Sequence, residues 1–197
     1  MATVTTASRR QGRGGRERIL AAAAELFASQ GINATGMEQI AERAPVSKRT
    51  LYAHFRTKDE LVLAHLKDLA STGRTLEGAL VREEVSAKER VLALFDPLPA
   101  GTDPVRGCPF IDAAVEFPDP LSAVHSYARE RKLLMVRLVA DLVADMGCRR
   151  PTDLAEQIVT LADGAASRAM VLGDADYGRY ARAAAEILLE NALPTTD

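Results

Sequence analysis

The sequence has few of the residues that bind metals or form disulfide bonds. Its 197 residues include two cysteines, Cys108 and Cys148, and three histidines. Neither cysteine has a second cysteine or a histidine nearby at the spacing of a zinc site. We therefore expect no metal and no cofactor, and we expect both thiols to be reduced.

Long hydrophobic runs are also missing. No stretch approaches the roughly 18 apolar residues that are needed to span a bilayer. The N-terminus also lacks the apolar segment of a signal peptide. These absences predict a soluble cytoplasmic protein that has no membrane partner.

Residue patterns that support catalysis are absent as well. There is no Glu-x-x-His pair of the kind used by di-metal helical bundles, no glycine-rich phosphate loop after a strand, and no Ser-His-Asp arrangement. The three histidines, His54, His65 and His125, are widely separated. We therefore expect no catalytic residues, and a helical-bundle enzyme is only an alternative.

The charge of the chain is unevenly distributed. Apolar residues make up 47% of the sequence, which is enough for a buried core, and the net charge is −2. Residues 1–60 hold 10 Lys and Arg against 6 Asp and Glu, whereas residues 61–197 hold 15 against 21. A basic N-terminal part joined to an acidic body indicates that the N-terminal part faces an anionic partner.

Residues 1–15 are expected to form a flexible basic arm. They are rich in Ala, Thr, Ser, Gly and Arg and poor in large apolar side chains. Arg9, Arg10 and Arg13 occur there and Arg16 follows directly, without an acidic residue among them. Two interpretations stay open: a solvated tail, or an arm that lies along phosphates or enters a minor groove.

Three short helices are predicted after the arm. Apolar residues recur at three- and four-residue spacing over residues 16–30, and Gly31 ends that helix. A second helix is predicted over residues 37–44, and Pro45 stops it because proline has no N–H to donate. Ser47 is predicted to cap the third helix by accepting from a free backbone N–H.

The third helix has an apolar side and a polar side. At 100° per residue, Leu51 and Phe55 point towards the first two helices. The opposite side carries two cations, an aromatic hydroxyl and a small residue: Lys48, Arg49, Tyr52 and Ala53. This combination suits the major groove of duplex DNA, where Arg49 can bind a guanine through two hydrogen bonds.

The residues of this stretch follow a known order and spacing: Gly31, Thr35, Met37, Ile40, Ala41, Ala44, Val46, Ser47, Thr50, Leu51, Tyr52, His54, Phe55 and Lys58. Over roughly residues 16–65 the chain resembles the DNA-binding signature of the TetR family of bacterial regulators. It departs from that signature at Pro45, where the family usually has glycine, and at Gly36, where serine or threonine is common. The resemblance implies a set of DNA contacts: Thr35, Ser47, Lys48, Arg49, Tyr52, His54 and Lys58.

A longer helix is predicted to join this head to the rest of the chain. Thr57-x-x-Glu60 is a capping box, and the helix that it opens is predicted to continue to about Val81. The DNA-binding domain is expected over residues 16–62 and an effector-binding and dimerisation domain over residues 63–197. The family resemblance implies that tilting the joining helix would shift the recognition helix.

The body is predicted to contain only helices. Five more are expected at residues 86–98, 109–117, 122–146, 151–172 and 177–191. The sequence has no internal repeat and no sustained strand alternation. We therefore predict an all-α fold of about nine helices, with a three-helix helix-turn-helix head and a larger ligand-binding and dimerisation bundle.

The favoured function is a ligand-responsive transcriptional regulator, a repressor that a small molecule releases from its operator. One short recognition helix reads too few base pairs, so a homodimer on double-stranded DNA is expected. The expected dimer interface lies on the last two helices, at Leu154, Ile158, Leu161, Ala165, Ala169, Ile187 and Leu188. The pocket for the unknown effector is expected among Phe95, Phe110, Phe117, Tyr127, Met135 and Met170.

A redox-sensing regulator is the alternative reading of the same DNA-binding head. In that case oxidation of Cys108 or Cys148, instead of a small molecule, would control DNA binding. Neither the effector, the operator nor the sign of regulation is encoded in the residues quoted above.

Overall fold

A computed structural model describes residues 5–72, 75–96, 107–173 and 177–194 of the chain. These ranges contain ten α-helices and one 3-10 turn: α1 (Thr5–Gln30), α2 (Met37–Arg43), α3 (Lys48–His54), α4 (Lys58–Ser71), α5 (Leu76–Leu80), α6 (Ala87–Leu92), η1 (Ala93–Phe95), α7 (Pro109–Glu116), α8 (Ala123–Asp145), α9 (Pro151–Leu172) and α10 (Tyr177–Ala192). The predicted all-α fold is confirmed. Among these helices, none has the length and hydropathy of a membrane span.

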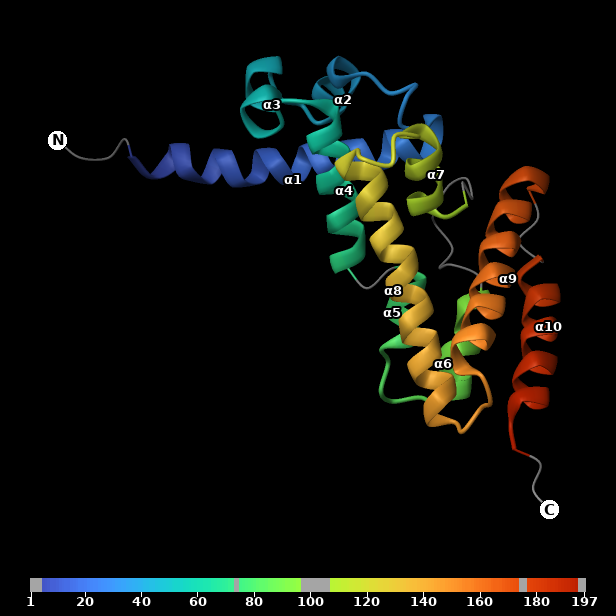
Figure 1. Cartoon of the computed structure of the whole chain (residues 1–197). Helices are drawn as coiled ribbons and strands as arrows, with labels where there is room; N and C mark the ends of the chain where they lie inside the picture. Colours follow the sequence, from blue (N-terminus) through green and yellow to red (C-terminus); the bar gives the residue numbers. More distant parts are fainter. Residues whose placement is uncertain (1–4, 73–74, 97–106, 174–176, 195–197) are drawn as a thin grey trace.

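The helices form a small head on a longer body. Figure 1 shows α1, α2 and α3 at one end, and the long helices α8, α9 and α10 along the body, with α9 packed against both α8 and α10. The N-terminal part of α1 projects beyond the rest of the molecule. Helix α4 runs from the head into the body beside α8.

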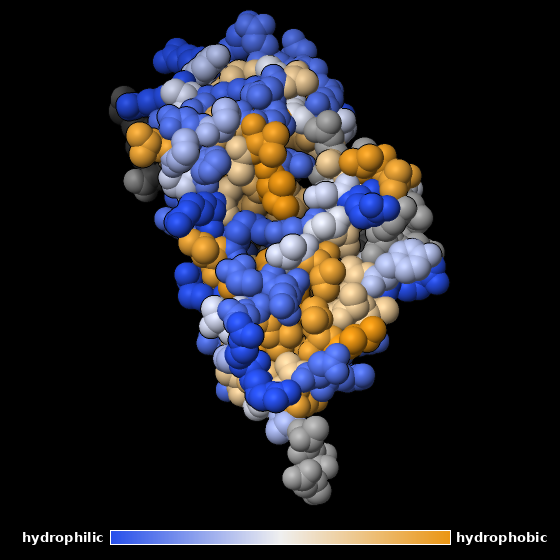
Figure 2. All heavy atoms as spheres, turned by 45° about the vertical axis from the view of Figure 1, so that its right-hand side comes forward, coloured by the Kyte–Doolittle hydropathy of each residue, from blue (hydrophilic) through white to orange (hydrophobic). Residues whose placement is uncertain are grey.

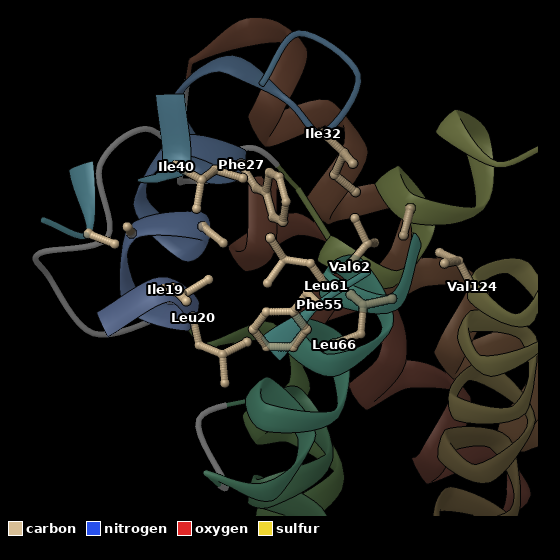
Figure 3. Close-up of a cluster of buried hydrophobic side chains, with 14 of the residues drawn as sticks. Ile19, Leu20, Phe27, Ile32, Ile40, Phe55, Leu61, Val62, Leu66 and Val124 are labelled. Carbon is tan, nitrogen blue, oxygen red and sulfur yellow. The ribbon is translucent and has the colours of Figure 1, made fainter. Parts of the chain in front are cut away.

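The head does not have a separate core, because its buried side chains continue into the body. We call this cluster the upper core, and it includes Ile19, Leu20, Phe27, Ile40, Leu51, Phe55, Leu61, Val62, Leu66, Phe110, Ala113, Val124 and Ala128. In Figure 3, Leu61, Val62 and Leu66 of α4 lie between the head residues and Val124 of α8. The head and the top of the body are therefore held together by one apolar contact region.

A second cluster, the lower core, holds the remaining helices together. It is formed by α5, α6, η1, α8, α9 and α10, and its fully buried members include Val91, Val139, Val143, Ile158 and Leu189. Helix α8 contributes to both cores, through Val124 at its start and Val139 further along. Helix α8 therefore connects the upper core to the lower core.

Two predicted helix starts are confirmed by their hydrogen bonds. Ser47 Oγ accepts from the Thr50 N–H at 3.1 Å, and Thr57 Oγ1 accepts from the Glu60 N–H at 3.1 Å. The Glu60 carboxylate accepts from the Arg56 N–H at 2.8 Å, one residue before the expected partner. Short polar side chains therefore determine where α3 and α4 begin.

The predicted arm is largely helical. Helix α1 begins at Thr5, eleven residues before the expected Arg16, so residues 5–15 continue the first helix of the head. Extending an existing helix costs much less than nucleating one, so α1 continues through a segment that is poor in large apolar side chains.

The single helix predicted from Thr57 to about Val81 is wrong, because α4 ends at Ser71 and α5 begins at Leu76. The hydroxyl of Ser71 donates to the Asp68 carbonyl at 2.8 Å, and that of Thr72 donates to the Leu69 carbonyl at 2.8 Å. Hydroxyls that bond to the preceding turn compete with helical hydrogen bonding and weaken the helix at that point.

Pro45 lies in the turn between α2 and α3 with an unusual backbone angle. Its φ is 25°, whereas the proline ring favours about −65°. Positive φ is the conformation that glycine adopts without steric cost, and glycine is the residue that the family signature has there. Pro45 is therefore strained in this turn.

We predict that Pro45→Gly stabilises the protein by about 1 kcal/mol, because relief of about 1–3 kcal/mol of strain outweighs the added freedom of the unfolded chain. Urea denaturation measures the effect. Pro109→Gly is the matched control: Pro109 occupies the first turn of α7, where proline is well accommodated, so this change should destabilise the protein. A Pro45→Gly variant as unstable as the control would contradict the strain.

His65 is buried on α4, with 7% of its surface exposed, and its ring centroid lies 5.4 Å from that of Phe27. Burial lowers its pKa from 6.5 to about 4, although the nearby Asp68 opposes this shift. The imidazole is therefore neutral in the folded protein at neutral pH.

This burial predicts acid sensitivity. The unfolded chain takes up a proton at His65 below pH 6.5 and the folded chain only near pH 4, so stability is lost between those values. We expect the wild type to lose about 2 kcal/mol more than His65→Leu between pH 7 and pH 5. Urea titrations of both proteins at the two pH values measure this difference, and equal losses would refute it.

Candidate nucleic-acid interface

Helix α3 presents a polar side to solvent, as predicted. Leu51 and Phe55 are 0% and 3% exposed and pack into the upper core. Lys48, Arg49, Tyr52 and Ala53 are exposed on the opposite side. Figure 1 shows α3 at the outer surface of the head, clear of the body. The predicted orientation of the third helix is therefore confirmed.

The two cations at the start of α3 differ in their surroundings. Lys48 forms an ion pair with Glu38 of α2, and that hydrogen bond raises the pKa of Lys48. Arg49 has no ion pair or hydrogen bond with any residue that the structure describes. Its guanidinium is therefore available to bind an anion or a base edge without breaking an existing contact.

Thr35 was wrongly included among the exposed contact residues. It is 0% exposed, and its hydroxyl donates to the Gly31 carbonyl at 2.7 Å. The side chain closes the turn between α1 and α2, so it has no surface to offer a ligand. Gly36 follows it, and its N–H donates to the Gln39 side chain at 3.2 Å.

The other predicted contact residues are partly used inside the head. Ser47 Oγ caps α3, as described above. The His54 ring is half-buried, and a Cβ at Gly15 of α1 would lie only 3.2 Å from its Nε2 atom. Lys58 Nζ donates to the Asn33 carbonyl at 3.3 Å. Tyr52 is 46% exposed. Tyr52 and Arg49 are both exposed, and unlike Ser47, Lys48 and Lys58 their side chains form no hydrogen bond with a described residue.

Helix α1 contributes positioning contacts that the sequence pattern did not reveal. The Arg16 guanidinium lies 5.4 Å from the Phe55 ring centroid, and Arg18 Nε donates to the Ala44 carbonyl at 3.3 Å. Both contacts hold the turn and the recognition helix against α1. The sequence of a basic segment does not show which of its arginines contact the protein and which face solvent, so these contacts could not be predicted.

The six predicted pocket residues do not form one cluster. Phe95 and Met135 are buried in the lower core, and Phe110 is buried in the upper core. Phe117 and Tyr127 pack against the upper core, and Met170 is 40% exposed beside Gly107. Three of the six are therefore plain core residues.

Two ion pairs inside the body were not predicted. Arg131 pairs with the buried Glu77 of α5, and Lys132 pairs with Asp163 of α9. The Arg131 Nε atom is buried and finds no hydrogen-bond partner among the residues that the structure describes, and burial lowers the pKa of Arg131. Because helical spacing alone does not show which charged residues turn inward, only the packing of α8 reveals them.

The predicted dimer residues divide into buried and accessible groups. Leu154, Ile158 and Ala169 are 5%, 0% and 8% exposed, so the prediction is wrong for them: α9 lies between α8 and α10, and its most apolar stripe faces the chain's own core. Leu161, Ala165 and Leu188 are half-buried, whereas Ile187 is 58% exposed.

Three further apolar residues of α9 and α10 are exposed and were not predicted: Tyr180, Val171 and Leu172. Figure 2, which brings the α9 and α10 side forward, shows hydrophobic atoms at this surface.

The two cysteines are in different clusters. Cys108 packs against the upper core and Cys148 is buried in the lower core. Burial raises the pKa of both thiols, which lowers the thiolate fraction that oxidation requires. These surroundings do not favour the redox-sensing alternative.

Comparison with known proteins identifies the same N-terminal region. Residues 19–65 match the sequence model described as "Bacterial regulatory proteins, tetR family". The HTH-type transcriptional activator FasR of Mycolicibacterium smegmatis is 40% identical over 85 residues, which cover 41% of this chain and only 39% of FasR. The HTH-type transcriptional regulator YjdC of Escherichia coli K12 is 28% identical over 88% of this chain and 93% of YjdC.

Solved structures extend the likeness to the body. The TetR-family regulator SCO4454 of Streptomyces coelicolor superimposes with a TM-score of 0.82, at 28% identity over 92% of this chain and 97% of that one. A TetR regulator of Streptomyces avermitilis gives 0.77, at 29% identity over 90% and 97%. The helix-turn-helix geometry and these likenesses together indicate the function class: residues 19–65 form a DNA-binding region of the TetR family, and the whole chain is similar in sequence and fold to TetR-family transcriptional regulators.

Proposed function

We propose that this protein is a repressor that binds operator DNA as a homodimer and is released by a small molecule. The observation that carries the proposal is the exposed side of α3, where Arg49 has no partner among the described residues. The head that presents this side shares its core with the body. Repression needs no further interaction, because a dimer bound across an operator excludes other proteins from that DNA. FasR is named an activator, but its match covers too little of either chain to carry the sign of regulation.

Release by an effector follows from the shared upper core. A ligand that binds one state of the body more tightly shifts the population towards that state. Because Leu61, Val62 and Leu66 of α4 pack against both the head and α8, a change in the body alters the position of α3. Two heads that are wrongly spaced cannot occupy successive major grooves.

The body also offers support for an effector site among α5, α7, α8 and α9. Apart from the buried Glu77, the side chains of the ion pairs Arg131–Glu77 and Lys132–Asp163 are 21–26% exposed, so their charges remain able to contact an effector. Among the predicted pocket residues, Phe117, Tyr127 and Met170 keep accessible surface. The proposed domains follow: residues 16–62 bind DNA, and residues 63–197 bind the effector and dimerise.

We expect Arg49→Ala to weaken binding to the specific operator by about 1–3 kcal/mol and to relax sequence preference, because Arg49 reads a base edge. The operator is first selected from random duplexes. Fluorescence anisotropy at one fixed salt concentration then compares it with a scrambled duplex. Unchanged affinity and preference would show that α3 does not read DNA through Arg49.

Two variants serve as controls for this measurement. Lys58→Ala should weaken binding to both duplexes nearly equally, as expected for a phosphate contact. Arg137→Ala removes an exposed arginine from α8 in the body, and it should leave both affinities unchanged.

Dimerisation through α9 and α10 predicts that Ile187→Glu gives a monomer. Twofold symmetry places the charge at the interface twice, and burying an unpaired carboxylate is costly. Sedimentation velocity measures the mass. Val81→Glu, at another exposed apolar position (59%), should remain a dimer. A dimeric Ile187→Glu variant would move the interface away from this part of α10.

A further inference from the structure

The turn between α1 and α2 presents two backbone N–H groups that do not donate to any described residue of the head. Gly31 ends α1 with φ 92°, and the Thr35 N–H closes the turn by donating to the Ile32 carbonyl at 3.1 Å. The N–H groups of Ile32 and Asn33 follow the left-handed Gly31. Successive N–H groups in such a turn form a concavity that binds an anion.

A carboxylate from the body occupies this concavity. Glu116 Oε1 accepts from the Ile32 N–H at 2.9 Å, and Oε2 accepts from the Asn33 N–H. The Asn33 amide Nδ2 also donates to the Glu116 backbone carbonyl at 3.4 Å. Glu116 is the last residue of α7, and Figure 1 shows α7 beside the end of α1. Hydrogen bonds to a charged acceptor are about twice as strong as neutral ones.

Helix α7 connects this contact to the rest of the body. The Phe117 carbonyl, next to Glu116, lies 2.8 Å from His125 Nδ1 at the start of α8. Gly107, just before α7, lies against α9, where a Cβ would be in ordinary van der Waals contact with Met170 Sδ at 3.5 Å. Helix α7 therefore runs from α9 to the turn of the head.

The same turn is held from a second side. Lys58, the first residue of α4, donates to the Asn33 carbonyl at 3.3 Å. Asn33 is therefore fixed by the start of α4 and by the end of α7. The upper core alone is non-directional and allows small rotations of the head, whereas two N–H bonds to one carboxylate require one orientation.

We propose that Glu116 is a positioning residue for DNA binding, whose carboxylate fixes the orientation of the head on the body and transmits a displacement of α7 to α3. This inference rests on the proposed function, in which the head binds an operator. The concavity requires an anion with two acceptor oxygens. Glu116→Gln keeps the shape but turns an amide donor towards one of the two N–H groups.

The first test measures head positioning directly. Affinities are compared for the selected operator and for the same operator with one base pair inserted between its half-sites. Heads that are held in one orientation on the body should bind the selected spacing more tightly than the altered one. We expect Glu116→Gln to lower operator affinity about tenfold and to reduce the ratio between the two duplexes at least threefold. The matched control, Glu83→Gln, removes an exposed carboxylate between α5 and α6 and should keep both values.

The second test needs no DNA. Amide hydrogen exchange at Ile32 and Asn33 should be at least tenfold faster in Glu116→Gln than in the wild type, with unchanged exchange in the lower core. Glu116→Asp keeps the charge but reaches only one N–H, and it should give intermediate exchange and intermediate spacing discrimination; it replaces Glu116→Gln if that variant does not fold.

The outcomes separate the two proposals. Wild-type spacing discrimination and wild-type amide exchange in the Glu116 variants would overturn the positioning role. If the wild type binds no duplex selectively, the proposed function is overturned. The exchange measurement still decides whether Glu116 holds the turn.

Discussion

The apolar contact between α4 and its neighbours is the constraint on which the rest of the structure depends. Leu61 and Val62 are fully buried where α1, α3 and the top of α8 meet, so the helix that leaves the head is also part of the body's core. Because the head shares this core, the placement of the recognition helix depends on the helices below it. A separate head joined by a linker would transmit no such displacement.

Polar contacts supply the orientation that apolar packing does not determine. Glu116 binds the turn that follows α1, Arg18 holds the Ala44 carbonyl, and Ser47 begins α3. Each contact joins a charged or hydroxyl side chain to backbone groups that no helix satisfies. Turns and helix ends leave such groups free, and for that reason the head's geometry is determined at its turns.

Much of the candidate site could be predicted from single-helix patterns. The Ser47 cap and the inward direction of Leu51 and Phe55 follow from local hydrogen bonding and a period of 3.6 residues, and the structure has both. The errors arose where a residue's surroundings come from elsewhere in the chain. Thr35 is buried by its own turn, and Ile158 is covered by other helices, so their exposure could not be deduced from spacing. The pairing of Lys48 with Glu38 also required the relative placement of α2 and α3.

The sequence by itself determined the class of the protein: an all-α chain with a basic head, a capped recognition helix and a stop at Pro45. These properties are local, because caps, helical periodicity and backbone preferences act within a few residues. The tertiary structure alone decided that Lys48 is paired whereas Arg49 has no partner in the described part of the chain, which face of α9 remains at the surface, and that Glu116 reaches the turn at Ile32. Those properties join residues up to 84 positions apart, and only packing brings such residues within hydrogen-bonding distance.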